Sequence, residues 1–114
     1  MTREEVENMP AGREMDALVA QSIMGCVDIS LYRDIWTHGL KGYRQVVEHY
    51  STDISDAWKV IEFLEANTEY WAIGKKYLNN DYSVEFAAGG KKSEEIHAET
   101  APLAICRSAL LATL

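Results

Sequence analysis

The stretch from His49 to Glu65 constrains the fold more than any other part of the chain, because it has the clearest helical pattern. Its apolar residues recur at the three- and four-residue spacing that places side chains on one face of a helix. This predicted core face consists of Ile54, Ala57, Trp58, Ile61 and Leu64. Either Ser51 or Asp53 can cap the helix by accepting backbone N–H bonds. Asp53 and Asp56 also place negative charge in the first turn, where the helix dipole favours it.

Two more helices are predicted near the start of the chain. Thr2 and Glu5 form a capping box, which predicts a short helix over residues 3–8. Pro10 suits the first turn of a second helix that runs to about Met24. Its predicted core stripe consists of Met15, Leu18, Val19, Ser22, Ile23 and Cys26. Arg13 projects roughly opposite to this stripe, which is typical of a solvated charge.

The third quarter of the chain predicts an antiparallel hairpin. Residues 70–78 and 82–88 favour strands, and Asn79-Asn80-Asp81 supplies the turn. Alternation in the second strand predicts that Ser83 and Glu85 face away from the core. The residues predicted to share a face are Trp71, Ile73 and Tyr77 in the first strand and Tyr82, Val84, Phe86 and Ala88 in the second. Residues 94–99 predict a third, charged strand.

The last predicted helix follows Thr100, which is a natural N-cap, and has Pro102 in its first turn. Its predicted core stripe consists of Leu103, Cys106, Leu110 and Leu114. Arg107 lies beside this stripe, where a guanidinium needs a partner. Two alternatives remain open for that partner: a carboxylate such as Asp53 or Asp56, and an anionic ligand.

Residues 26–47 have the weakest pattern. Residues 27–31 alternate in hydropathy and favour a short strand. An aromatic stretch follows and ends in a glycine turn. Two interpretations of its side chains remain open: they form a ligand wall, or they cover the edge of the core or a subunit interface. The side chains concerned are Tyr32, Trp36, His38 and Tyr43.

Length and composition fit a single α+β domain over residues 1–114. The chain is 47% hydrophobic, enough for a core. The predicted sheet is small and antiparallel, formed by the hairpin at about 70–88 and one or two short strands, with helices packed around it. The sequence has no apolar run long enough to span a membrane, and its acidic start is unlike a signal peptide.

The formal net charge of −7 argues against general binding to nucleic acid or anionic membranes, which needs many Lys and Arg residues. One small anionic ligand held by one or two arginines remains compatible with it. No cofactor or metal is expected, because His38, His49 and His97 are scattered and both cysteines are isolated. No catalytic motif is present, and a hydrolase built from carboxylates and His49 is the remaining enzyme alternative.

Three segments, residues 10–20, 49–58 and 100–111, together resemble the phage ABA sandwich domain and, more distantly, phage NinX-like proteins. The resemblance implies helices on both sides of a small sheet. It brings no catalytic residues to this sequence. It also implies a short phage accessory protein that acts in the host cytoplasm.

The resemblance leads to a functional hypothesis: an anti-defence protein that sequesters a nucleotide-derived host immune signal without cleaving it. The expected ligand is a cyclic nucleotide or an ADP-ribose derivative, which needs aromatic faces, arginines and helix N-termini. The residues predicted to bind it are Tyr50, Ser51, Thr52, Asp53, Trp58, Trp36 and Arg107, with Trp71 and Arg44 as further candidates. Trp58 is equally the natural core anchor of its helix.

A homo-oligomer is also expected. Val60 and Phe63 lie off the main stripe of the central helix, and the last helix is apolar nearly all round. Such surplus apolar surface fits an interface between copies. The alternative function is an interaction with a host or phage protein through the same surface, which the acidic charge suits.

Overall fold

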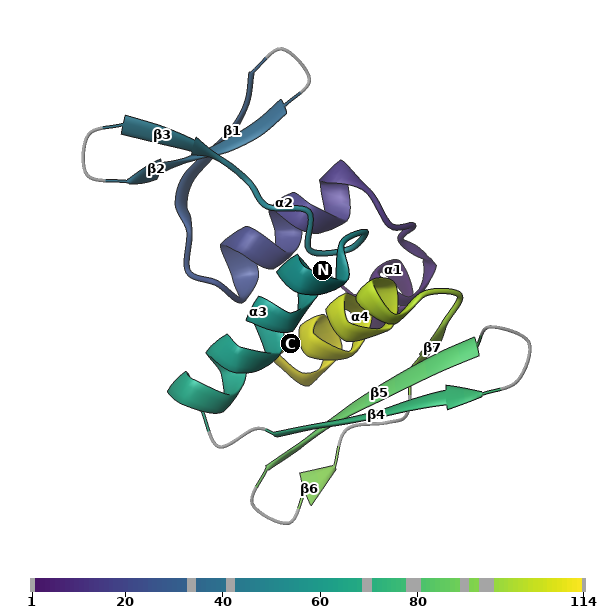
Figure 1. Cartoon of the computed structure of the whole chain (residues 1–114). Coiled ribbons are helices and arrows are strands. Elements are labelled where there is room, and N and C mark those ends of the chain that lie inside the picture. Colours follow the sequence, from purple (N-terminus) through teal and green to yellow (C-terminus); the bar gives the residue numbers. More distant parts are fainter. Residues whose placement is uncertain are drawn as a thin grey trace.

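Helices lie between two small antiparallel sheets in this chain (Figure 1). The structure is a computed structural model and describes residues 2–32, 35–40, 43–68, 71–77, 81–88, 91–92 and 96–113. The helices are α1 (Arg3–Asn8), α2 (Arg13–Ser22), α3 (Ile54–Asn67) and α4 (Ala101–Thr113). The strands are β1 (Val27–Tyr32), β2 (Ile35–Leu40), β3 (Tyr43–Val46), β4 (Trp71–Tyr77), β5 (Asp81–Ala88), β6 (Lys91–Lys92) and β7 (Ile96–Ala98).

The two sheets contact different helices. Sheet A, formed by β1–β3 in sequence order, contacts α2. Sheet B is the hairpin β4–β5, with β6 and β7 added to β5, and it contacts α3 and α4. The predicted α+β class and the hairpin with short added strands are confirmed. The order of layers differs from the expectation, because the helices lie between two sheets and not on both sides of one (Figure 1).

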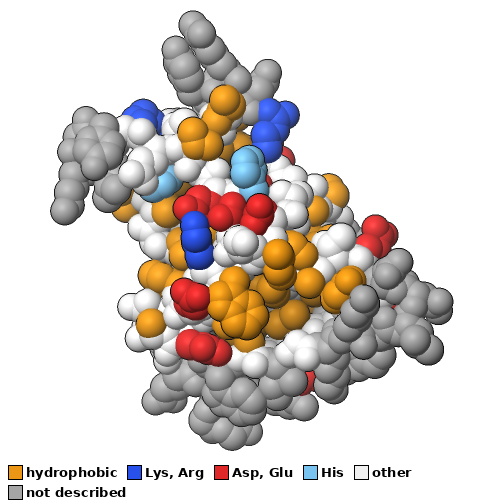
Figure 2. Space-filling view, viewed as in Figure 1, with side chains coloured by type: hydrophobic (Ala, Val, Ile, Leu, Met, Phe, Trp, Pro, Cys, Tyr) orange, Lys and Arg blue, Asp and Glu red, His pale blue; other side chains and the backbone are white. Residues whose placement is uncertain are grey.

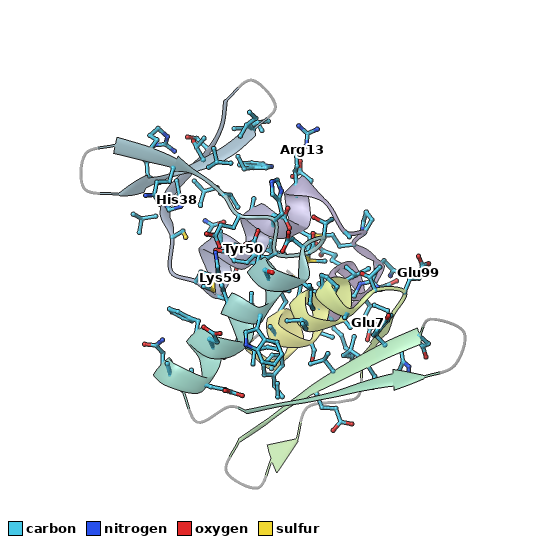
Figure 3. The ribbon with its side chains drawn as sticks, in the orientation of Figure 1. Glu7, Arg13, His38, Tyr50, Lys59 and Glu99 are labelled. Atoms are coloured by element: carbon cyan, nitrogen blue, oxygen red, sulfur yellow. The ribbon has the colours of Figure 1, made fainter. Side chains whose placement is uncertain are left out.

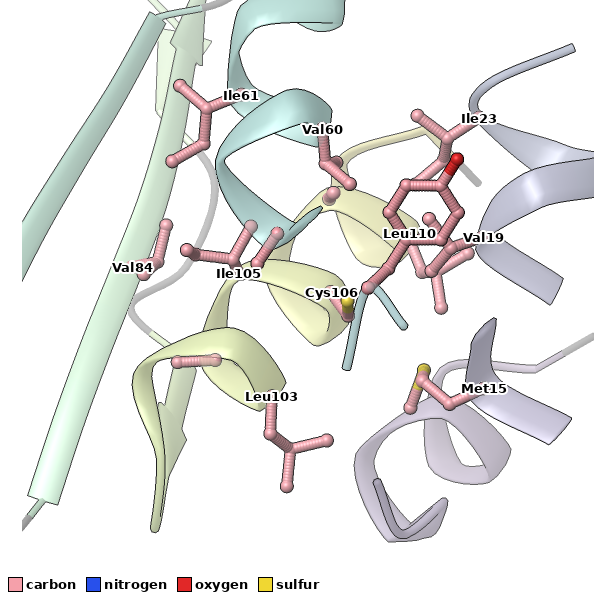
Figure 4. Close-up of a cluster of buried hydrophobic side chains, with 14 of the residues drawn as sticks. Met15, Val19, Ile23, Val60, Ile61, Val84, Leu103, Ile105, Cys106 and Leu110 are labelled. Carbon is pink, nitrogen blue, oxygen red and sulfur yellow. The ribbon is translucent and has the colours of Figure 1, made fainter. Parts of the chain in front are cut away.

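Helix α4 is the centre of the molecule and contacts α1, α2, α3, β5 and β7. Thr100 caps it as predicted, since its Oγ1 accepts from the Leu103 N–H at 3.4 Å. Figure 4 shows Leu103, Ile105, Cys106 and Leu110 of α4 among core side chains of α2, α3 and β5. Most apolar side chains of α4 are therefore buried in the core of one chain, and the homo-oligomer stays a prediction. Leu114 lies outside the described residues.

Helix α3 begins as predicted but buries a different face. Asp53 Oδ1 accepts from the N–H groups of Ser55 and Asp56 at 2.8 and 3.1 Å. The buried residues of α3 are Ala57, Val60, Ile61 and Leu64. Ile54 and Trp58, predicted as core, are 52% and 54% exposed, whereas Val60, predicted to be surplus, is fully buried. Helix α3 packs on α4 with the face that carries Val60, so Val60 belongs to the core. Trp58 lies on a different face of the helix, beside sheet B. Phe63 is partly buried against the core.

Helix α1 and its Thr2 cap are confirmed. Helix α2 starts later than predicted, because Gly12 takes a φ of +148°, which only glycine adopts readily. Pro10 therefore precedes the helix and is not in its first turn. Met15, Val19 and Ile23 are buried as predicted, and Leu18 and Cys26 are partly buried. Ser22 is exposed, and Asp16, Ala17 and Ala20 are buried in its place.

Strand β1 is confirmed, and the aromatic stretch after it contributes two further strands, β2 and β3, which the sequence pattern does not predict. Strand β1 contains a bulge, since Asp28 takes a left-handed φ of +56° and the β1–β2 register shifts between Val27 and Ser30. Arg44 of β3 braces this bulge: its guanidinium bonds Asp28 Oδ2 at 2.6 Å, Ser30 Oγ at 2.7 Å and Thr37 Oγ1 at 2.9 Å. Nothing is described of the Tyr32 and Tyr43 side chains.

The predicted faces of β5 are only partly correct. Val84 and Phe86 are buried and Tyr82 is partly buried, as predicted. Ser83 and Glu85 were predicted to face away from the core, yet they are buried too. Strand β5 is an interior strand, with β4 on one edge and β6 and β7 on the other. The predicted third strand is shorter than 94–99, since β7 covers Ile96–Ala98. The side chains of Trp71, Ile73, Tyr77 and Ala88, and residues Asn79 and Asn80, lie outside the description. Within the described part, no helix has the length and apolarity to cross a membrane.

Candidate ligand pocket between helix α2 and sheet A

A buried carboxylate marks the candidate site. Asp16 lies in the first turn of α2 and is 3% exposed. Its Oδ1 accepts from the Ser51 N–H at 2.7 Å and from the Ser51 hydroxyl at 2.6 Å. The helix dipole and these two donors favour negative charge at this position. A buried carboxylate needs such partners, so its position is firmly defined.

Ser51 joins the turns that precede α2 and α3. It is fully buried, and its Oγ also accepts from the Gly12 N–H at 2.9 Å. Both backbone segments are thereby held against the Asp16 carboxylate. The second oxygen of that carboxylate, Oδ2, lies 3.9 Å from Nδ1 of the exposed His49. Ser51 was one of two predicted caps for α3; Asp53 has that role, and Ser51 supports Asp16 instead.

A cavity of about 230 Å³ opens beside this cluster. Its lining combines one carboxylate, one guanidinium, one imidazole and an apolar wall from sheet A: Arg13, Asp16, Ile35, Trp36, Val46, Val47 and His49. Figure 3 shows Arg13 at the start of α2 on the side of sheet A, and His38 well apart from it. A few convergent polar groups in an apolar cleft are typical of small-molecule sites.

The predicted turn residues lie behind or beside this pocket. Tyr50 is buried, and burial, followed by the negative charge of Glu48, raises the pKa of its hydroxyl well above the ordinary tyrosine value. Thr52 is exposed, and Asp53 uses its carboxylate to cap α3. Glu48 itself pairs with Lys59 at 2.8 Å, and this hydrogen bond raises the pKa of the lysine. Of the predicted residues, Trp36 therefore lines the pocket and Ser51 supports it.

Arg107 lies in a different place. Its Nη2 donates to the Met9 carbonyl at 2.9 Å, and its side chain lines a separate cavity of about 520 Å³. The predicted alternative of a pair with Asp53 or Asp56 is wrong, because the guanidinium is directed to the segment between α1 and α2. That cavity also contains His97, whose Nδ1 is 2.7 Å from Asp81 Oδ2. Arg44, another candidate, is committed to the β1 bulge.

Trp58 lies in a third place, a groove of about 320 Å³ between α3 and sheet B. Figure 2 shows hydrophobic side chains gathered there, with acidic side chains beside them. The groove has apolar walls from α3, α4, β4 and β5 and carries Glu65 on its rim. The predicted binding residues are thus divided among three cavities and are not brought together.

The geometry gives little support to nucleophilic chemistry in the described residues. The Ser51 hydroxyl is buried and donates to Asp16, which leaves it poorly placed for activation by His49. Burial raises the pKa of the Cys106 thiol far above its ordinary value, and it raises that of Cys26 as well. Within the described ranges, no three His, Cys, Asp or Glu side chains come together as a metal site.

Sequence comparison gives the family. The model of the phage ABA sandwich domain matches residues 17–110, which is most of the chain. The chain belongs to the phage ABA sandwich domain family. No significant match is found among curated proteins or among solved structures.

The ABA sandwich match covers Trp36, His49, Ser51 and all of α3, and it begins one residue after Asp16. This family is a phage accessory domain and not a known enzyme family. Sequence reasoning missed Asp16, and it interpreted Arg13 as solvated charge. The available signal was an acidic residue in the first turn of α2 next to Met15 and Ala17 of the core.

Proposed function

We propose that this phage ABA sandwich protein is a non-enzymatic binding protein that sequesters a small nucleotide-derived immune signal in the host cytoplasm. The observation that carries the proposal is the buried Asp16 carboxylate, fixed by Ser51, beside a pocket that Trp36 and Arg13 line. A carboxylate held in this way selects ligands that carry N–H or O–H donors.

Each part of a nucleotide has a complementary group in this pocket. Asp16 Oδ2 can accept from an exocyclic amine of a base or from a ribose hydroxyl. Trp36 provides an aromatic face on which a base stacks. Arg13, at the start of α2, combines a guanidinium with the positive end of the helix dipole, which suits a phosphate.

The size and charge of the molecule favour one compact ligand over a polymer. The pocket of about 230 Å³ accommodates a base and part of a sugar, with the phosphates directed outward to Arg13. A net charge of −7 opposes the many phosphates of a nucleic acid. The turn residues Tyr50, Thr52 and Asp53 stay predicted contacts. Trp58 and Arg107, which were also predicted to bind the ligand, line separate cavities and are not part of the proposed site.

A homo-oligomer is part of the proposal, through a surface other than the one expected from the sequence. Sheet A exposes four large apolar side chains: Val27, Leu31, Ile35 and Val46. Ile35 and Val46 also line the pocket. A second copy packed on sheet A would therefore bury apolar surface and extend the pocket wall at the same time.

The test is a release assay with a matched control. Purified protein is mixed with cyclic nucleotides and ADP-ribose derivatives, separated from free ligand and heat-denatured, and the released compound is identified by mass spectrometry. We expect intact ligand from the wild type. Trp36→Ala should bind at least about fivefold more weakly and retain correspondingly less, since stacking on an aromatic side chain contributes about 1–3 kcal/mol per base. Trp58→Ala, which changes a different cavity, should retain the wild-type amount.

Two outcomes would contradict the proposal. Chemically altered ligand would make the protein an enzyme. Capture that depends on Trp58 and not on Trp36 would move the site to the groove beside α3. Arg13→Ala adds a further criterion, because it should weaken phosphorylated ligands more than the corresponding nucleosides.

Binding of a host or phage protein is the second candidate function. The half-exposed Trp58 and Ile54 favour it, because large apolar side chains at a groove are typical of protein contacts. If no compound in the panel is captured, this candidate takes first place.

A further inference from the structure

We propose that the groove between α3 and sheet B docks a cationic amphipathic helix of a partner protein. This inference rests on the second candidate function and names the chemistry of its partner. It does not depend on the ligand pocket beside Asp16, because the two sites share no lining residue.

The groove has the form of a helix-binding site. Its floor is apolar and includes Ile61 of α3, Val84 of β5 and Ile105 of α4. Ile54 and Trp58 stand on its rim, each with about half of its surface exposed. Tryptophan is one of the side chains enriched among the residues that dominate protein interfaces. An amphipathic helix lays spaced apolar side chains into such a groove.

The charges along α3 determine the sign of the partner. Trp58, Glu62 and Glu65 follow one another at helical spacing of four and three residues, so they share one side of the helix. Both glutamates are exposed, and neither pairs with a cation among the described residues. Lys59, the cation of α3, is already engaged by Glu48 and Asp56. On the face that Figure 2 shows, acidic side chains lie next to a group of hydrophobic ones.

This charge pattern disfavours the other possible occupants. A second copy packed groove to groove would bring the same glutamates against each other, so the two grooves would repel. A phosphorylated ligand would face Glu65. A helical segment with apolar residues on one face and Lys or Arg on its flanks would bury the apolar residues in the groove and place its cations next to the glutamates.

The experiment uses two defined probes and the full chain. One probe is a fluorescein-labelled helical peptide of leucine and lysine, with leucine at positions i, i+3, i+4 and i+7. The other has the same leucines and glutamate for every lysine. Fluorescence anisotropy should show binding of the lysine peptide only. The affinity should fall when salt is raised from about 50 mM to about 500 mM, because exposed charges are then screened.

Variants separate the groove from general attraction to an acidic protein. Trp58→Ala keeps every charge and should weaken the lysine peptide at least about tenfold. Glu62→Gln with Glu65→Gln should weaken it about threefold to tenfold. The control Glu4→Gln with Glu14→Gln removes the same charge from exposed sites on α1 and α2 and should leave the affinity within about twofold.

Three results would overturn the inference. They are equal binding of the two peptides, unchanged affinity in Trp58→Ala with its folding verified by circular dichroism, and a wild-type dimer in light scattering that Trp58→Ala dissociates. The last result would assign the groove to a second copy. The release assay distinguishes this inference from the ligand proposal, since Trp58→Ala should leave nucleotide capture intact.

Discussion

At the scale of single residues, Ser51 should matter to stability more than its small size suggests. Ser51→Ala removes the hydroxyl that donates to the Asp16 carboxylate at 2.6 Å and accepts from the Gly12 N–H. Hydrogen bonds to charged groups contribute about 1.5–3 kcal/mol, and losing one leaves a buried carboxylate less well satisfied. We expect the free energy of unfolding in urea to fall by about 2–3 kcal/mol.

Ser55→Ala is the matched control, because Ser55 is an exposed serine in the first turn of α3. Its effect should stay within about 0.5 kcal/mol. A similarly small effect of Ser51→Ala would mean that the Asp16 cluster is not rigid, and the ligand proposal would lose its basis. The role of Ser51 was not predictable from the sequence, because its partner Asp16 is 35 residues away. Local pattern identified Ser51 only as polar and near a helix start.

At the scale of elements, Val60→Ala in α3 should destabilise the protein more than Trp58→Ala. The sequence pattern suggests the reverse, because it assigns Trp58 to the core. Val60→Ala creates a cavity at a fully buried position and should cost about 2 kcal/mol. Trp58→Ala removes a larger side chain but leaves no closed cavity, because the position is 54% exposed, and it should cost less than Val60→Ala. Urea unfolding of both variants measures the two effects on the same helix. A larger loss from Trp58→Ala would make Trp58 a core residue and leave the groove without its anchor.

The sequence predicts the existence, cap and approximate limits of α3, because these depend on neighbours within one or two turns. It does not predict the buried face. Ala57, Ile61 and Leu64 belong to both the predicted and the observed face, and only contacts with α4 decide that Val60, and not Trp58, joins them. In sheet A the alternation of residues 27–31 predicts strand β1, but it does not predict the bulge at Asp28. The register then depends on Arg44, which is 16 residues away from Asp28.

At the scale of the whole molecule, the α+β class was predictable and the layer order was not. The α+β class is predictable because the hydrophobic periodicity of each segment indicates whether it forms a helix or a strand. Layer order depends on which apolar faces meet, and α4 presents apolar side chains all round. Such a helix suits a protein interior as well as an interface between copies. Contacts with three helices and with strands of sheet B resolve this choice in favour of the interior.

This arrangement predicts unequal local stability. The α4 amides should exchange hydrogen only on global unfolding, because α4 is buried at the centre. In the described part of the chain, sheet A packs mainly on α2 and exposes Val27, Leu31, Ile35 and Val46, so its amides should exchange through local opening at lower free energy. Hydrogen exchange followed by mass spectrometry measures both. Equal protection of sheet A and α4 in a monomer would contradict the prediction, whereas equal protection that is lost on dilution would indicate copies packed on sheet A.

The same measurement connects local stability to the proposed function. Trp36 and Val46 belong to sheet A and line the pocket, whereas Asp16 belongs to α2. A ligand that bridges these elements must slow exchange in β2 and β3, because it stabilises the closed arrangement over the locally opened one. The groove beside α3 predicts the opposite pattern: the lysine peptide should slow exchange in α3 and β4 and leave sheet A unchanged. If a captured nucleotide slowed hydrogen exchange in α3 and β4 instead of β2 and β3, the nucleotide site would be the groove beside α3 and not the pocket beside Asp16.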